Sequence, residues 1–172
     1  VRDLLLNIPN KDIDIVVEGN GILFASDLAE EFDGKVKSHE KFGTSVVIFP
    51  DGYRIDVAMA RVEYYEYPAA LPTIKQSSVN SDLYRRDFTI NSLAVKLNGE
   101  GAFSLMDLFN GKRDLKNKEI NVLHNLSFID DPCRLFRAIK FEQRFSFKIS
   151  KQTEEFMRVA VKKRLVDSLS GA

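Results

Sequence analysis

Short stretches of hydrophobic residues, some alternating with polar ones, dominate residues 1–60 and predict β-strands. The strands are expected at 12–17, 35–40, 44–49 and 53–60. Pro50-Asp51-Gly52 lies between the last two strands and is typical of a tight turn, which predicts an antiparallel hairpin. Residues 21–32 instead carry hydrophobic side chains at helical spacing, with Gly34 following where a helix-ending glycine is common. Residues 1–6 can form the end of another helix.

The regular pattern stops between residues 61 and 81, where prolines and a polar segment interrupt any period. Such a composition predicts a long loop that is less ordered than the other internal segments. Short strands are expected again at 91–97 and 119–123, together with a short helix at 105–115 that Gly111 interrupts.

From Ser127 onward the hydrophobic spacing is helical, with Pro132 in an early turn where proline is tolerated. A second helix is expected at 151–169. A mixed sheet followed by helices predicts an α+β fold. We expect a head at residues 1–122 and the start of an all-helical neck at residues 123–172.

The composition is that of an ordinary globular protein, with 44% hydrophobic and 29% charged residues. No hydrophobic segment approaches the roughly 18 residues that a membrane-spanning helix needs, so no membrane contact is expected. The single cysteine, Cys133, cannot form an internal disulfide, which favours a reducing cytoplasm. A net charge of zero argues against a large RNA-binding surface within these residues.

Two aspartates, Asp12 and Asp14, lie on the same face of the first predicted strand. Their carboxylates repel each other, and a bound divalent cation such as Mg²⁺ would relieve that repulsion. Asp56 lies in another predicted strand and offers a third oxygen ligand. An Asp-x-Asp pair alone is a weak signal, because one is expected by chance in an aspartate-rich chain.

Arg85-Arg86-Asp87 is followed closely by Asn91, at the edge of a hydrophobic segment. An isolated Arg-Arg pair usually marks a solvated helix end. Here the guanidinium groups can bind phosphate, while the carboxylate and the amide can bind ribose. The combination fits a nucleoside triphosphate.

Residues 130–141 predict a strongly amphipathic helix. Its hydrophobic face is expected to hold Pro132, Leu135, Phe136 and Ile139. Asp131 and Arg134 are three residues apart, so they are neighbours on the polar face. For such a pair an intrahelical salt bridge is the usual interpretation.

The segment 85–94 reads Arg-Arg-Asp-Phe-Thr-Ile-Asn-Ser-Leu-Ala and resembles the signature of class II tRNA nucleotidyltransferases and bacterial poly(A) polymerases, departing only at Ser92. The spacing of residues 1–14, the segment 106–115 and the acidic-Asp-Pro-x-Arg motif at 130–134 resemble three further motifs of that family. The resemblance implies a DNA polymerase β-like nucleotidyltransferase head. It also implies Mg²⁺-dependent transfer of AMP or CMP from ATP or CTP to the 3′ end of tRNA.

The resemblance also implies a role for each candidate residue. Asp12, Asp14 and Asp56 would hold the metal ions. The base edge would be read by Asp131 and Arg134, and the ribose would contact Asp87 and Asn91. The triphosphate charge would be neutralised by Arg2, Arg86, Arg137 and Lys140.

The chain departs from the family pattern in several places. Asp130 stands where glutamate is frequent, Lys140 where arginine is common, and Asn121 where an arginine is usual. The two glycines that normally precede the first motif are not in this sequence. We therefore expect a piece of a longer protein that continues at both ends, with most tRNA contacts in the missing parts.

Three functions remain open at this point. Residues 64–72 favour, by resemblance, a tRNA enzyme that adds CCA or only the terminal A. A bacterial poly(A) polymerase would carry the same motifs. A non-catalytic nucleotide- or RNA-binding module is disfavoured, because all three candidate metal carboxylates are present. We interpret His39 and His124 as ordinary structural or surface residues.

Overall fold

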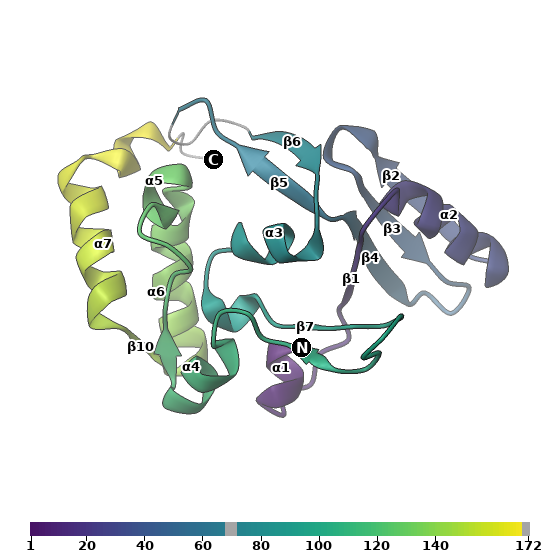
Figure 1. Ribbon diagram of the computed structural model, residues 1–172, viewed down its shortest axis with the longest axis horizontal. Helices are drawn as coiled ribbons and strands as arrows, with labels where there is room; N and C mark the ends of the chain where they lie inside the picture. Colours follow the sequence, from purple (N-terminus) through teal and green to yellow (C-terminus); the bar gives the residue numbers. More distant parts are fainter. Residues whose placement is uncertain (68–71, 170–172) are drawn as a thin grey trace. The chain divides into compact units, whose positions relative to one another are not determined.

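The computed structural model describes residues 1–67 and 72–169 and is drawn in Figure 1. The chain divides into two compact units. The sheet unit consists of Pro9–Glu63 and Ile74–Asp82, and the helix unit of Val1–Ile8, Tyr64–Thr73 and Leu83–Ala172. The mixed four-stranded sheet and the helices confirm the predicted α+β class.

The sheet unit is built on four strands in the order β1-β4-β3-β2. The strands are β1 (Ile13–Val17), β2 (Lys35–His39), β3 (Thr44–Ile48) and β4 (Arg54–Met59). β1 runs parallel to β4, whereas the β4–β3 and β3–β2 pairs are antiparallel. These four strands, and the hairpin that joins β3 to β4, confirm the sequence prediction.

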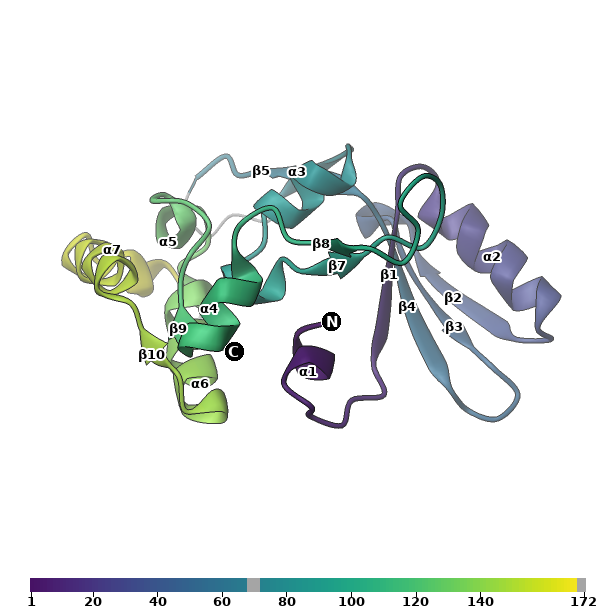
Figure 2. The same ribbon diagram turned by 60° about the horizontal axis from the view of Figure 1, so that its bottom comes forward.

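One face of this sheet is covered by α2 (Gly21–Glu31), as Figure 2 shows. The side chain of Asn20 starts the helix by accepting hydrogen bonds from the first free N–H groups, which is a usual N-cap arrangement. The small side chains of the helix pack on buried valines of the sheet: Ala25, Ala29, Val47 and Val57. This packing fixes which side chains of each strand face away from α2.

We call the side of the sheet away from α2 the outer face. Successive residues of a strand point to opposite sides, so this face is read from the strand register. It holds, strand by strand, Asp14 and Val16 of β1, Arg54, Asp56 and Ala58 of β4, Thr44, Val46 and Ile48 of β3, and Lys35, Lys37 and His39 of β2.

The prediction of a long loop at residues 61–81 is wrong. The segment contains β5 (Arg61–Tyr64) and β6 (Thr73–Gln76), which pair with each other, and then α3 (Val79–Tyr84). The prolines lie between the two strands rather than within them, so they do not interrupt the pairing. The centre of the segment, residues 68–71, lies outside the described residues.

The helix unit has the following elements along the chain: α1 (Arg2–Leu5), the 3₁₀ turn η2 (Thr89–Asn91), β7 (Ala94–Val95), β8 (Leu105–Met106), α4 (Gly111–Asn117), β9 (Glu119–Ile120), α5 (Ser127–Asp130), α6 (Cys133–Phe145), β10 (Lys148–Ile149), α7 (Lys151–Lys162) and the 3₁₀ turn η3 (Leu165–Ser168). None of the helices in residues 1–67 and 72–169 has the length and hydrophobicity of a membrane-spanning segment.

One buried cluster of this unit joins residues before and after position 122. Phe88, Ile90 and Ile120 pack in one buried cluster with Phe141 and Phe147. A second cluster joins α5, α6 and α7 through Phe128, Leu135 and Ala160. The predicted boundary between a head and a neck at residue 122 stays a prediction.

Several predicted boundaries in this unit are corrected by the structure. The strand at 91–97 is limited to Ala94–Val95, and the helix at 105–115 begins rather than breaks at Gly111. The helix begins at Gly111 because the carboxylate of Asp107 accepts hydrogen bonds from the first N–H groups of α4. Pro132 was expected inside a helix that starts at Ser127. It instead separates α5 from α6, because proline has no N–H group to continue the helical hydrogen bonds.

Gly111 approaches Thr89 too closely to carry a side chain. A Cβ atom at position 111 would lie 2.3 Å from the carbonyl oxygen of Thr89 and 3.0 Å from its carbonyl carbon. Gly111→Ala should therefore force two packed backbones apart and lower the free energy of unfolding by about 1–3 kcal/mol. Urea unfolding of the two proteins measures the difference, and an unchanged midpoint would contradict this close approach.

Candidate functional site

Two of the candidate metal carboxylates are paired side by side in the sheet unit. Asp14 of β1 and Asp56 of β4 are register partners in the parallel pair, and both are exposed on the outer face. Adjacent strands lie about 4.8 Å apart, so the two carboxylates are close neighbours. Asp12 precedes β1 and is also exposed, with its backbone N–H bonded to Asn10 Oδ1 at 2.8 Å.

The Asp14–Asp56 pair fits a hard divalent cation. Mg²⁺ is commonly held by one or two carboxylates together with substrate phosphates and water, and does not need an all-protein cage. Across the described residues, no three His, Cys, Asp or Glu side chains gather closely enough to hold a metal ion by themselves. Asp12 as a third ligand therefore stays a prediction.

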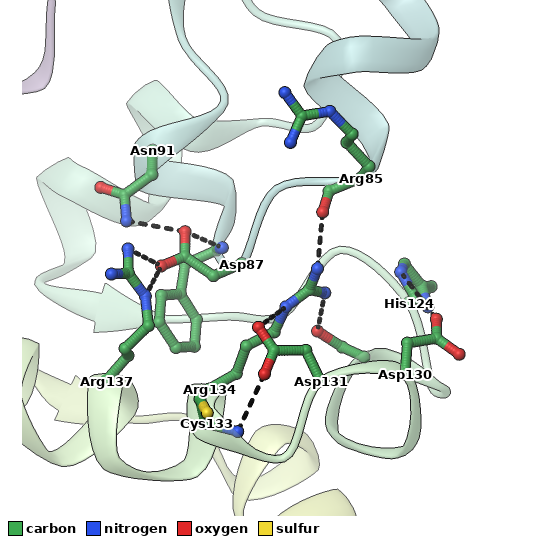
Figure 3. Close-up of polar contacts among 11 residues, drawn as sticks. Arg85, Asp87, Asn91, His124, Asp130, Asp131, Cys133, Arg134 and Arg137 are labelled. Carbon is green, nitrogen blue, oxygen red and sulfur yellow. Dashed lines mark hydrogen bonds and ion pairs between the residues drawn. The ribbon is translucent and has the colours of Figure 1, made fainter. Parts of the chain in front are cut away.

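In the helix unit, Asp87 is held by hydrogen bonds to both of its carboxylate oxygens (Figure 3). Oδ1 accepts from the N–H of Phe88 at 2.8 Å and from Asn91 Nδ2 at 2.9 Å. Oδ2 accepts from Arg137 Nε at 2.7 Å and lies 2.6 Å from Arg137 Nη2. Asp87 is buried, so these contacts fix its carboxylate and the partly exposed Arg137 in one orientation.

Asn91 links this pair to two further candidate arginines. Its side-chain oxygen accepts a hydrogen bond from Arg2 Nη1, and its backbone oxygen accepts one from Arg86 Nη1 at 3.5 Å. Arg2 also donates to Asp3 Oδ1 at 2.7 Å. The structure thus gathers Arg2, Arg86 and Arg137 around Asp87 and Asn91.

Part of the positive charge in this group is already compensated. Arg2 pairs with Asp3 and Arg137 with Asp87, and the Arg2 guanidinium lies 4.7 Å from the ring centroid of Phe145. The sequence reading missed Asp3, which is 4% exposed, because nothing in its spacing distinguishes it from a surface aspartate. Lys140, one turn along α6 from Arg137, is exposed.

Arg134 was expected on the polar face of the 130–141 helix, and this prediction is wrong. Arg134 is only 5% exposed and belongs to the buried face of α6 with Leu135, Ala138 and Phe141. Phe136 and Ile139, assigned to the hydrophobic face, are 56% and 47% exposed. The helix turns a different side inward because the guanidinium group finds buried hydrogen-bond acceptors, which the spacing of apolar residues does not reveal.

Those acceptors come from two other segments of the helix unit. Arg134 Nη1 donates to Ser127 Oγ at 2.8 Å and Nη2 to the backbone oxygen of Arg85 at 2.6 Å, both drawn in Figure 3. Nε lies 3.6 Å from Asp131 Oδ2. Ser127 and the carbonyl group of Arg85 were missed by the sequence reading, since neither belongs to the helix motif.

Asp131 keeps one side open to solvent. Its Oδ1 accepts a hydrogen bond from the N–H of Cys133 at 3.0 Å, and its side chain is 33% exposed. The contact holds the carboxylate at the start of α6, beside Arg134. A fixed acceptor next to a fixed donor can read the hydrogen-bonding edge of a nucleotide base.

His124 stacks on Tyr84 with the ring centroids 5.1 Å apart. Its interpretation as an ordinary structural or surface residue stays a prediction. Burial lowers the pKa of His124 from its ordinary value, an effect that Asp130, with Oδ2 at 4.0 Å from Nε2, partly opposes.

This lowered pKa makes stability depend on pH. The unfolded chain protonates His124 more readily than the folded one, so stability should fall as the pH drops below about 6.5. His124→Asn removes this contribution and should lose less stability than the unmodified chain between about pH 7.5 and pH 5. Thermal unfolding across this range measures the effect. Equal losses in both proteins would show that His124 does not protonate on unfolding.

A mixed sheet with paired carboxylates on its outer face, followed by helices with a fixed Asp–Arg pair, matches the DNA polymerase β-like nucleotidyltransferase head that the sequence resembles. The chain belongs to the family of the poly A polymerase head domain, whose model matches residues 1–121.

Similar proteins carry related names. The chain is 60% identical over 171 residues to an A-adding tRNA nucleotidyltransferase of Geobacter sulfurreducens, covering 99% of this chain and 19% of that protein. It is 40% identical to an A-adding tRNA nucleotidyltransferase of Halalkalibacterium halodurans, covering 99% of this chain and 40% of that protein. The chain thus spans about a fifth to two fifths of the length of these relatives.

Solved structures give the same likeness. A CCA-adding enzyme in its apo form II superposes with a TM-score of 0.93 at 52% identity, covering 99% of this chain and 40% of that chain. The Thermotoga maritima CCA-adding enzyme in complex with tRNA superposes with a TM-score of 0.85 at 46% identity, covering 99% of this chain and 38% of that chain.

Proposed function

We propose that this chain belongs to an enzyme that transfers AMP from ATP to the 3′ end of tRNA. The 3′ hydroxyl of the tRNA attacks the α-phosphorus of ATP, a new phosphodiester bond forms, and pyrophosphate leaves. The observation that carries the proposal is the register pairing of Asp14 with Asp56 on the exposed outer face. Two uncovered carboxylates side by side destabilise the empty site and favour a bound cation.

Asp14 and Asp56, with Asp12, would hold Mg²⁺. When bound there, the cation would supply Lewis-acid activation of the attacking hydroxyl and charge stabilisation of the leaving pyrophosphate. Asp56 lies on a strand anchored by the buried Val57 and the partly buried Ile55, so its carboxylate is positioned by the core of the sheet unit. The same argument applies to Asp14, whose neighbour Ile15 packs against that core.

The helix unit would bind the nucleotide. Asp87 and Asn91 would contact the ribose, and Arg2, Arg86, Arg137 and Lys140 the triphosphate. Arg137 now pairs with Asp87, and a triphosphate would compete for its exposed N–H groups. The pairing with Asp87 sets where the guanidinium lies before the nucleotide arrives.

Asp131 and Arg134 would select the base. Adenine and cytosine each present an amino donor beside a ring acceptor, which complements a carboxylate beside a guanidinium. Guanine and uracil present the opposite polarity and would leave buried groups unpaired. Because Ser127 and the Arg85 carbonyl group fix the guanidinium, the protein itself would do the work of a template.

Addition of A alone is favoured by the names of the relatives at 60%, 40% and 44% identity, all A-adding tRNA nucleotidyltransferases. Addition of the whole CCA sequence is the second candidate, because the solved structure at 52% identity is a CCA-adding enzyme. The partners would be ATP, with or without CTP, and the tRNA 3′ end, and we place the reaction in the cytoplasm.

The full-length protein can be tested with three tRNA transcripts that end before CCA, after the first C and after CC. Extension of only the last transcript, by a single AMP from ATP, is the expected result. Extension of all three with CTP and ATP would instead establish CCA addition. A long run of A on every RNA would identify a poly(A) polymerase, and no extension at all would contradict the proposal.

A further inference from the structure

A row of basic residues borders the carboxylates on the outer face of the sheet unit. Lys35, Lys37 and His39 alternate along β2, and all three are exposed. The register places Lys37 beside Val46, Val46 beside Asp56, and Asp56 beside Asp14. One line across the sheet therefore runs from a lysine on the edge strand to the two carboxylates.

The spacing along this line follows from the sheet itself. Lys37 is two strands from Asp56, a separation of roughly 10 Å at about 4.8 Å per strand. Lys35 lies two residues from Lys37 on the same strand face, roughly 7 Å away. The flexible lysine side chains can reach several ångströms towards the carboxylates. The basic row therefore lies about one to two nucleotides from the proposed reaction centre.

We propose that Lys35 and Lys37 bind the phosphate backbone of the RNA strand whose 3′ end is extended. The inference rests on the proposed function, because the 3′ hydroxyl would have to lie at Asp14 and Asp56. The strand then continues across β4 and β3 towards β2, with its phosphates meeting the lysines. Arg54, exposed on the same face of β4, adds positive charge on that side of the carboxylates.

The chemistry of the face selects phosphate rather than bases. Between the lysines and the carboxylates lie Val46 and Ile48 of β3, and no Phe, Tyr or Trp side chain belongs to the outer face as the register defines it. Single-stranded nucleic acid is usually held by aromatic stacking together with basic groups. With basic groups alone, the contact reads charge and not sequence, so it should be sensitive to salt.

An alternative role for edge lysines is protection of the sheet edge against pairing with another chain. β2 is the last strand of the sheet, so this role is physically reasonable. The two roles predict different losses, since edge protection affects self-association whereas phosphate binding affects the RNA.

The test uses the full-length protein and a tRNA transcript that ends in CC. The variants are K35A/K37A, the charge-keeping K35R/K37R and, as a matched control, K148A/K151A, which removes two exposed lysines of the helix unit. The Kd for tRNA is measured by fluorescence anisotropy over a range of KCl concentrations, and the KM values for tRNA and ATP by transfer.

K35A/K37A should raise the Kd and KM for tRNA roughly 10-fold at about 0.1 M salt. It should also reduce the slope of log Kd against log[KCl] by about 1.4. The KM for ATP should not change, K35R/K37R should restore tRNA binding, and K148A/K151A should match the unmodified protein. If the double variant does not fold, Lys37→Ala alone serves as the test. It should reduce the slope of log Kd against log[KCl] by about half as much.

An unchanged Kd for tRNA would overturn the inference, and self-association of K35A/K37A with normal tRNA binding would assign the lysines to edge protection. A rise in the KM for ATP alone would assign them to the triphosphate and equally overturn it. Absence of transfer by the unmodified protein would refute the proposed function separately, because the tRNA-binding arm does not depend on turnover.

Discussion

Asn in place of Asp14 or Asp56 is expected to lower AMP transfer by roughly 1000-fold or more, equivalent to about 4 kcal/mol of transition-state stabilisation. Asparagine has nearly the same shape as aspartate but lacks the negative charge that holds a divalent cation. Single-turnover transfer to a tRNA ending in CC measures the loss. The fold should not suffer, because each substitution removes one of two neighbouring negative charges.

Asp27→Asn is the matched control for this experiment. Asp27 is exposed on α2, which packs on the opposite side of the same sheet, so its loss should leave transfer unchanged. Thermal unfolding of all three variants completes the test. If Asp14→Asn melted well below the unmodified protein, Asp14 would be a structural residue, and if it transferred AMP at the normal rate, it would not hold the metal.

Arg134→Ala is expected to damage both stability and base selection. It leaves Ser127 Oγ and the carbonyl oxygen of Arg85 without their buried donor, at a cost of roughly 2–5 kcal/mol. Nucleotide choice should weaken as well, with UTP and GTP becoming relatively better substrates than before. Urea unfolding measures the first effect, and transfer from each of the four nucleotides to a tRNA ending in CC measures the second.

Asp131→Asn separates these two effects. Its Oδ1 can still accept from the N–H of Cys133, and the side chain is partly exposed, so stability should change little. An amide in place of the carboxylate adds a donor where only an acceptor stood, which should relax the choice between ATP and the other nucleotides. Unchanged ratios among the four nucleotides in both variants would show that this pair does not read the base.

The four-stranded sheet was predictable because its signals are local. The turn at Pro50-Asp51-Gly52 fixes a hairpin, and the alternation in residues 12–17 and 53–60 decides which side chains share a face. The sequence predicted that Asp14 and Asp56 share a metal site, but not that they are direct neighbours on paired strands. Their register depends on a parallel pairing between distant strands, which no local pattern encodes.

The helix unit was less predictable because its burial is decided by polar contacts. Arg134 goes inward on α6 because Ser127 and the carbonyl group of Arg85 meet it there, whereas Phe136 stays exposed. The prediction for residues 61–81, most of which belong to the sheet unit, failed for another reason. The two strands of this segment are short and separated by prolines, so composition alone resembles that of a loop.

We propose that the carboxylates of the outer face hold a divalent cation for the transfer reaction. Binding of Mn²⁺ in the presence of ATP, followed by electron paramagnetic resonance, tests this most directly because it does not depend on tRNA or turnover. We expect the full-length protein and its Asp27→Asn variant to bind Mn²⁺ alike, whereas the variant with both Asp14→Asn and Asp56→Asn should bind it at least about 10-fold more weakly. Equal Mn²⁺ affinity in all three proteins would contradict the assignment of the metal site to Asp14 and Asp56.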